Sequence, residues 1–189
     1  MITHKGTETI DTQRLHLRKL SSEDAEQMYH NWAYDERVTR YLTWEPHASV
    51  EASRELLTNW SNLYDFPHYY NWGIEFEGQL IGNISVVRFN EDCEWCDLGY
   101  CIGYDWWSRG IVTEAVRAVI AFLFEEVGVH RIKIMHLKDN PASGRVAVKC
   151  GMLYEGTDRE AFKLRDGKFM DQVNYSILRN EYFQKKIEQ

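Results

Sequence analysis

Alternating hydrophobic and polar positions predict seven β-strands along this chain. A period of two residues is typical of a strand with one buried face. Short links between the second, third and fourth of these segments predict an antiparallel meander, and Asp166-Gly167 between the last two favours a hairpin. The seven segments are residues 12–18, 69–76, 79–89, 95–102, 130–137, 154–164 and 169–178.

Apolar residues at helical spacing predict four helices. The first follows Ser21, a capping residue, and the strongest runs over residues 113–127. The other two are predicted at residues 49–63 and 141–149, and Gly151 suits the left-handed end of the last one. Between the first two helices, VTRYLTWEPH has no clear period, so it is either a loop that faces a ligand or a packed connection.

The order of these elements is β-α-α-β-β-β-α-β-α-β-β, which predicts an α/β (α+β) fold with helices packed on a mixed sheet. The strand-helix-strand passage over residues 95–137 should place its two strands parallel. We find no repeat or linker, so residues 1–189 are expected to form a single domain.

Composition and charge exclude some classes of protein. No apolar run approaches the roughly 20 residues that a membrane helix needs. The N-terminal segment lacks a signal-like apolar stretch, which predicts a cytoplasmic protein. A formal net charge of −7 argues against binding to nucleic acid and mildly favours a cationic substrate.

The cysteines and histidines do not indicate a metal site. Cys93 and Cys96 form a C-x-x-C pair, but a second pair is missing and the surrounding residues resemble a strand. We therefore expect reduced thiols packed in or near a core, Cys101 and Cys150 included. The seven histidines show no ligand spacing, so no metal is predicted.

The segment WWSRGIVTEA, residues 106–115, joins an aromatic pair to a small basic turn and a helix. A helix start exposes amide groups without intrahelical partners and carries partial positive charge, so it favours anions. Ser108 and Gly110 would let the backbone approach a phosphate, and Arg109 would add a donor. Neither a Walker loop nor a dinucleotide fingerprint is present, and an ordinary strand-to-helix turn is the alternative.

Four motifs in order resemble the GNAT superfamily of acetyltransferases, in the branch of the ribosomal-protein N-terminal acetyltransferases (RimJ/RimL type). Residues 107–115 resemble its pyrophosphate loop, W-G-x-G-x-A-T-E-A, with Ser108 and Val112 as departures. Serine can replace the usual glycine at position 108 if its backbone angles are ordinary. The valine side chain at position 112 is larger than the usual glycine or alanine and leaves less room in the first helical turn. The other segments are DLGYCIG at residues 97–103, NPAS at 140–143 and CGMLYEG at 150–156.

The resemblance implies a GNAT fold, with a mostly antiparallel sheet of about seven strands and about four helices, and acetyl-CoA as co-substrate. The residues that it implies for cofactor binding are Tyr100, Cys101, Ile102, Trp107, Ser108, Arg109, Gly110, Ile111, Val112, Thr113 and Asn140.

Two residues are candidates for the catalytic acid–base chemistry. Asp97 matches the acidic position of this branch and is the candidate base, with Glu94 as fallback; either could instead be a solvated acid on a strand edge. Ser143 is the candidate acid for the departing thiolate, and Tyr100 and Tyr154 are alternatives. Without the resemblance, Asn140 and Ser143 would be interpreted as helix caps.

The reaction that the resemblance implies is acetyl transfer to an amine by direct attack in a ternary complex. The acceptor is a protein N-terminal amine or a small amine, and a homodimer is common in the family. A non-catalytic acetyl-CoA sensor is the competing hypothesis. The aromatic residues Trp44, Tyr69, Tyr70 and Trp72 either wall the acceptor pocket or belong to the core.

Overall fold

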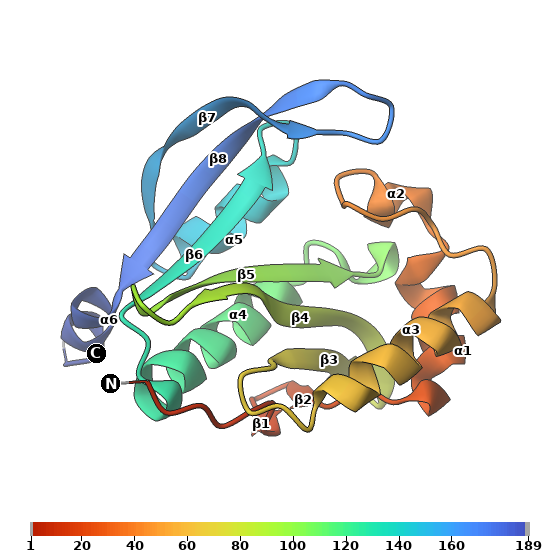
Figure 1. The fold of residues 1–189 in the computed structure, drawn as a ribbon, viewed down its shortest axis with the longest axis horizontal. Helices are drawn as coiled ribbons and strands as arrows, with labels where there is room; N and C mark the ends of the chain where they lie inside the picture. The colour runs from red at the N-terminus through yellow and green to blue at the C-terminus, as the bar shows by residue number, and fades with distance from the viewer. Residues whose placement is uncertain (1, 188–189) are drawn as a thin grey trace. The chain divides into compact units, whose positions relative to one another are not determined.

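The computed structural model describes residues 2–187 of the chain (Figure 1). This part has a mixed α/β fold with one eight-stranded, mostly antiparallel sheet, in the order β1-β2-β3-β4-β5-β6-β8-β7. The strands are β1 (Ile10–Asp11), β2 (Leu15–Arg18), β3 (Asn71–Phe76), β4 (Gln79–Asn90), β5 (Trp95–Ile102), β6 (Arg131–Leu137), β7 (Leu153–Lys163) and β8 (Phe169–Leu178). The α-helices are α1 (Ala25–Met28), α2 (Glu36–Thr39), α3 (Val50–Leu63), α4 (Ile111–Phe122), α5 (Pro141–Lys149) and α6 (Arg179–Ile187).

The chain divides into two compact units. The N-terminal unit consists of residues 4–85 and 100–118. The C-terminal unit contains residues 86–99 and 119–187, together with residues 2 and 3. The candidate residues around the start of α4 therefore belong to the N-terminal unit, and those around α5 belong to the C-terminal unit.

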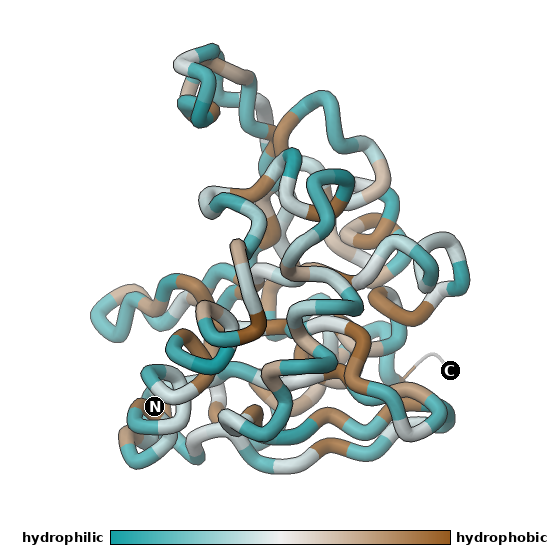
Figure 2. Tube along the Cα trace, turned by 90° about the vertical axis from the view of Figure 1, so that its right-hand side faces the viewer, coloured by the Kyte–Doolittle hydropathy of each residue, from teal (hydrophilic) through white to brown (hydrophobic). Residues whose placement is uncertain are grey.

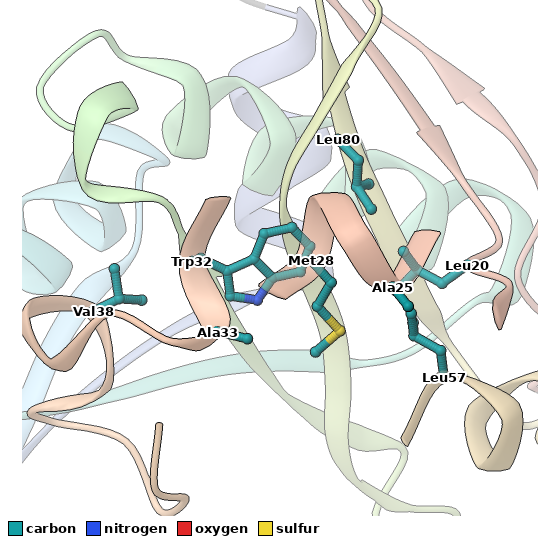
Figure 3. Close-up of a cluster of buried hydrophobic side chains, with 8 residues drawn as sticks. All are labelled: Leu20, Ala25, Met28, Trp32, Ala33, Val38, Leu57 and Leu80. Carbon is teal, nitrogen blue, oxygen red and sulfur yellow. The ribbon is translucent and has the colours of Figure 1, made fainter. Parts of the chain in front are cut away.

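The core of the N-terminal unit forms between its helices and its sheet. Figure 3 shows Met28 and Trp32 on one helical segment, with Leu57 on another helix and Leu80 on a strand. Trp32 and Leu57 are fully buried, as the helical spacing of the apolar residues predicts. Cys101, near the end of β5, packs against this cluster. The strand that carries candidate cofactor contacts is therefore anchored in the core.

The C-terminal unit is built on residues 95–99 of β5 and on β6, β8 and β7. Its β5 and β6 are parallel, with Trp95 opposite Arg131 and Leu98 opposite Ile134, which confirms the predicted parallel pair. Strand β8 is antiparallel to both β6 and β7. The turn between β7 and β8 has Gly167 at φ 87°, as expected for the Asp-Gly hairpin. Helix α5 lies against β6 and β8 (Figure 1).

The fold class, the seven predicted strands and the main helices are confirmed, and α5 and β8 have the predicted bounds, whereas β2 is only Leu15–Arg18. Three short or terminal elements were missed: β1, α2 and α6. Helix α2 begins just before the segment that has no clear period. Because α2 is only four residues long, it shows too little periodicity to be detected. Helix α4 begins at Ile111, two residues earlier than predicted, and a π-helical turn (Leu123–Val127) continues it.

Hydrophobic and hydrophilic stretches alternate along the whole described trace (Figure 2). Among the described residues, none of the helices is both long and apolar enough to span a membrane.

Gly103 follows the last residue of β5 at a point of close backbone approach. A Cβ atom at this position would lie 2.2 Å from the carbonyl oxygen of Asn31 and 2.7 Å from the ring of Trp106. The N–H of Gly103 donates to the carbonyl oxygen of Ile81 at 2.9 Å. Only glycine lets the chain pass here and enter the turn that leads to α4.

We expect Gly103→Ala to destabilise the protein by about 1–3 kcal/mol, because the added methyl group meets backbone that cannot yield cheaply. Urea unfolding followed by tryptophan fluorescence measures this change. Asp105→Ala, an exposed change in the following turn, is the control and should stay within about 0.5 kcal/mol of wild type. Equal midpoints for the two variants would contradict the steric argument.

Candidate active site

The loop before α4 has two residues in the left-handed region. Trp107 is extended, at φ −63° and ψ 156°, whereas Ser108 and Gly110 have φ of 61° and 75°. The N–H of Glu114 donates to the carbonyl oxygen of Gly110 at 3.1 Å, so the amides of Ile111 and Val112 precede the first bond of the helix. These amides, at the positive end of the helix dipole, form a site suited to an anion.

Ser108 does not have the ordinary backbone angles under which serine would be tolerable. The left-handed region brings Cβ too close to the following carbonyl oxygen, a cost of roughly 1–2 kcal/mol for a residue with a side chain. The branch usually has glycine here, and the φ of 61° gives the physical reason. Val112 lies in the first turn of α4 and is partly exposed, so its side chain is not enclosed by the fold.

Trp107 ties this loop to the end of β5. Its indole Nε1–H donates to the carbonyl oxygen of Ile102 at 2.9 Å, and its ring lies 4.9 Å from that of Tyr104. The ring remains 43% exposed. One candidate cofactor residue thus holds the backbone of another, since Trp107 and Ile102 were both predicted to bind acetyl-CoA.

The part of β5 predicted to contact the pantetheine arm extends beyond the parallel ladder. Pairing with β6 ends at Leu98, four residues before β5 ends. Cys101 is half-buried, and its Sγ donates to Oδ1 of Asn83 at 3.0 Å. Burial raises the pKa of the Cys101 thiol to about 12. Cys101 is therefore a protonated thiol at neutral pH and a poor nucleophile.

Asp97 is a buried carboxylate in the middle of β5, 1% exposed. Its Oδ2 lies 3.7 Å from Nε of Arg88, and its Oδ1 lies 3.6 Å from Nζ of Lys133. Among the described residues, neither oxygen has a hydrogen-bond partner. The alternative of a solvated acid on a strand edge is therefore wrong for Asp97: burial and two flanking cations give it an environment that surface acids lack.

Glu94, the fallback base, does not lie on the strand as expected. It is the last residue of the turn before β5 and has φ 52°, and its carbonyl oxygen accepts from the N–H of His130 at 2.8 Å. The turn comprises residues 91–94, since Asn90 still belongs to β4. Cys93 is consequently exposed rather than packed near a core, in contrast to the buried Cys96.

Asn140 and Ser143 lie on the first turn of α5. Asn140 occupies the N-cap position, but its side chain makes no capping hydrogen bond, and Pro141 is the first helical residue. The N–H of Ser143 donates to the carbonyl oxygen of Asn140 at 3.2 Å, so Ser143 is inside the helix and is not its cap. The capping interpretation therefore explains neither side chain.

The aromatic candidates divide between core and surface. Tyr70 and Trp72 are 1% and 0% exposed, so they belong to the core rather than to an acceptor pocket. Tyr69 is partly buried, and its hydroxyl accepts from Nδ2 of Asn71. Trp44 packs beside the core cluster. Tyr154 is 59% exposed, and its hydroxyl pairs with that of Thr157.

A hollow of about 320 Å³ lies on one flank of α5. It is lined by His136, Tyr175 and the side of the helix that carries Pro141, Arg145 and Val148. Ser143 does not line it, so this hollow is separate from the predicted acid. Among residues 2–187, no group of three or more His, Cys, Asp or Glu side chains could hold a metal ion.

No sequence pattern indicates the residues that support the loop before α4. Thr12 and Arg14 both bind the carboxylate of Glu114, about a hundred positions later in the chain. Because this contact joins a turn to a distant helix, neither periodicity nor motif spacing could reveal it. Glu114 belongs to the loop motif, but the motif does not indicate its partners.

Comparison with known proteins identifies the family. A family model described as an acetyltransferase (GNAT) domain matches residues 14–153. The chain belongs to the GNAT acetyltransferase family. The match covers both the loop before α4 and the first turn of α5.

Similar GNAT proteins are named N-acetyltransferases. The N-acetyltransferase YoaA of Bacillus subtilis (strain 168) is 31% identical over 90% of this chain and 96% of its own. The [ribosomal protein uS5]-alanine N-acetyltransferase of Escherichia coli (strain K12) is 28% identical over 87% of each chain. RimL, solved in complex with coenzyme A, has a TM-score of 0.83 and 20% identity over 92% of this chain and 99% of its own, which shows the shared fold. The chain is therefore a GNAT N-acetyltransferase with RimJ/RimL-type relatives.

Replacing Ser108 by glycine should stabilise this GNAT protein by about 1 kcal/mol, because glycine removes the left-handed strain. Ser108→Ala is the matched control: it removes the hydroxyl but keeps the strain, so it should remain close to wild type. Urea unfolding of the three proteins measures the difference. If glycine and alanine give the same midpoint, the φ of 61° carries no cost.

Glu114 should make the stability of the protein depend on pH. Burial acts to raise the pKa of Glu114, but hydrogen bonds from Thr12 and Arg14 outweigh it and lower the pKa. The stabilisation is present above the unfolded pKa of about 4.3 and is lost as pH falls through the lower folded pKa. The difference in unfolding free energy between wild type and Glu114→Gln should therefore be largest near neutral pH and shrink towards zero in acid. A difference that is constant from neutral pH to strong acid would show that ionised Glu114 contributes nothing.

Proposed function

We propose that this enzyme transfers the acetyl group of acetyl-CoA to the N-terminal amine of a protein, by direct attack in a ternary complex. The observation that carries the proposal is the loop of residues 107–113, where two left-handed residues turn the chain and present the first amides of α4. The pyrophosphate of acetyl-CoA is the anion for which this helix start is suited. We further propose that residues 1–189 act as one catalytic domain in the cytoplasm, which is where a ribosomal-protein acceptor would be met.

The residues present are compatible with coenzyme A. Gly110 leaves room over the loop, since a Cβ there would have only Nη2 of Arg14 within 4 Å, at 3.7 Å. The end of β5 extends past its ladder with β6, so the backbone around Tyr100 to Ile102 is suited to hydrogen bonds with the pantetheine arm. Asn140, whose side chain does not cap α5, would bind the same arm.

The chemistry needs a base, a polarised carbonyl and an acid. Bound acetyl-CoA supplies the thioester carbonyl carbon that the amine attacks. Asp97 takes the proton of the amine through one water molecule, since its oxygens have unfilled acceptor positions but are buried. A backbone N–H of the Tyr100–Ile102 segment stabilises the charge on the carbonyl oxygen. As the new C–N bond forms and the C–S bond breaks, Ser143 would protonate or hydrogen-bond the departing thiolate. The proton that Asp97 took from the amine would then replace it, so that free thiol is released and both side chains return to their starting state.

The state of the cysteines supports direct attack over an acetyl-cysteine intermediate. Burial raises the pKa of the Cys96 thiol well above its usual range and that of Cys101 to about 12. A thiol must ionise before it can act as a nucleophile, so these two would be unreactive. Trapping an acetyl group on Cys101 or Cys150 with acetyl-CoA alone would contradict the proposal.

The acceptor class is supported by the names of the relatives. Two relatives from Escherichia coli (strain K12) are named for ribosomal proteins, one as an alanine N-acetyltransferase and one as a serine acetyltransferase. A net charge of −7 is compatible with basic acceptors such as ribosomal proteins. Small amines, including polyamines and amino sugars, are the competing acceptors, and acetyl-CoA sensing without catalysis is the competing function.

An acceptor screen that follows free thiol release from acetyl-CoA tests these choices. Peptides with an N-terminal alanine or serine should give turnover, and the same peptides with a blocked N-terminus should not. Faster turnover with a polyamine or an aminoglycoside would replace the proposed acceptor. Binding of acetyl-CoA without turnover on any amine would favour a sensor.

Asp97→Asn should lower kcat by roughly 100-fold or more, the range usual for a general base, and leave the Kd of acetyl-CoA unchanged. Asp97→Glu should keep most of the activity, since the branch usually has glutamate there. Glu94→Gln is the matched control and should turn over at the wild-type rate.

Calorimetric titration with acetyl-CoA confirms that each variant is folded before its rate is compared. Wild-type kcat in Asp97→Asn together with a large loss in Glu94→Gln would assign the base to Glu94 instead.

A further inference from the structure

The turn before β2 contacts the first turn of α4. Glu114 accepts at Oε1 from the hydroxyl of Thr12 at 2.7 Å and from the N–H of Arg14 at 3.0 Å. Its Oε2 accepts from Nε of Arg14 at 2.7 Å. Three hydrogen bonds therefore fix one carboxylate on two residues that lie outside the helix.

Arg14 also reaches the loop itself. Its Nη1 donates to the carbonyl oxygen of Arg109 at 3.2 Å, while its Nε holds Glu114. A guanidinium group has several donors in a fixed plane, so both contacts are set together. The peptide between Arg109 and Gly110 is thus held from its oxygen side.

A planar trans peptide points its C=O and its N–H in opposite directions. Because the carbonyl oxygen of Arg109 is bonded to Arg14, the N–H of Gly110 must point away from Arg14. That N–H is the amide immediately before those of Ile111 and Val112 at the start of α4. Its direction decides whether the loop presents a continuous row of donors.

We infer that Arg14, held by Glu114 and Thr12, is a positioning residue that orients the Gly110 amide towards the pyrophosphate of acetyl-CoA. This inference rests on the proposed function and adds a residue outside the family motif to the cofactor site. Arg14 acts through the Arg109 carbonyl and does not itself bind the phosphates. Its side chain is 39% exposed and that of Glu114 is 20% exposed, so solvent weakens the ion pair and its contribution to stability is modest.

The test compares two probes, acetyl-CoA and S-acetylpantetheine, which lacks the pyrophosphate. Arg14→Gln should weaken acetyl-CoA binding about tenfold, the effect of losing one charge-assisted hydrogen bond, and leave S-acetylpantetheine binding unchanged. In steady-state assays KM for acetyl-CoA should rise and kcat at saturation should stay the same. A merely structural role would weaken both probes equally.

Arg14→Lys separates orientation from simple charge. Lysine keeps the positive charge but cannot bond Glu114 and the Arg109 carbonyl oxygen together, so it should lose as much affinity as glutamine does. Wild-type affinity for acetyl-CoA in Arg14→Lys would overturn the inference.

Arg18→Gln is the matched control, at the last residue of the strand that follows Arg14. Arg18 forms ion pairs with Asp24 and Glu75, away from the loop, so its loss should lower the melting temperature without changing the ratio of the two affinities. If wild-type protein binds S-acetylpantetheine but not acetyl-CoA, the proposal of a pyrophosphate site is wrong. If it binds acetyl-CoA and Arg14→Gln binds it equally well, only the role of Arg14 fails.

Discussion

The peptide between Arg109 and Gly110 can direct its N–H only one way once its carbonyl oxygen is bonded to Arg14. The pyrophosphate site proposed for the loop before α4 depends on that direction. Ser108 and Gly110 adopt left-handed angles to bring the peptide there, and Trp107 fixes the preceding backbone to Ile102. Since a serine is strained at such an angle, the loop keeps its shape at the expense of stability.

The buried carboxylate of Asp97 is a second costly feature. A charge removed from water must be compensated, and Arg88 and Lys133 do so by ion pairing at 3.7 and 3.6 Å without hydrogen bonds. A carboxylate that served only to stabilise the fold would be expected to fill its acceptor positions, as Glu114 does with Thr12 and Arg14. The contrast between these two acids favours a catalytic role for Asp97 and a structural role for Glu114.

Local patterns predicted most of the fold, because its strands and helices are long enough to show their periods. The bounds of α5 were correct since Pro141 and Gly151 mark its ends, and Asp166-Gly167 located the last hairpin. Strand β1, with two residues, and helix α2, with four, are too short to show a period. Cys93 was misplaced because a continuous polar-apolar pattern concealed the turn that ends at Glu94.

The cofactor loop could be predicted as a segment but not as a geometry. The motif located Gly110, yet only φ shows that Ser108 is also left-handed. The contact between Arg14 and Glu114 joins positions 100 residues apart, and a single sequence contains no signal for such a pair. Burial of Asp97 was equally hidden, since an aspartate on a strand is more often exposed.

The start of α5 shows how a helix end can leave a polar side chain for another purpose. A helix needs acceptors for its first amides, and an asparagine at the N-cap usually supplies one. Pro141 has no N–H to satisfy, and the N–H of Ser143 is bonded to the carbonyl oxygen of Asn140 rather than to its side chain. Asn140 can then occupy the N-cap position without capping, and its amide group keeps both a donor and an acceptor to offer. A pantetheine arm has amide groups that need both, and on this ground we propose Asn140 as one of its contacts.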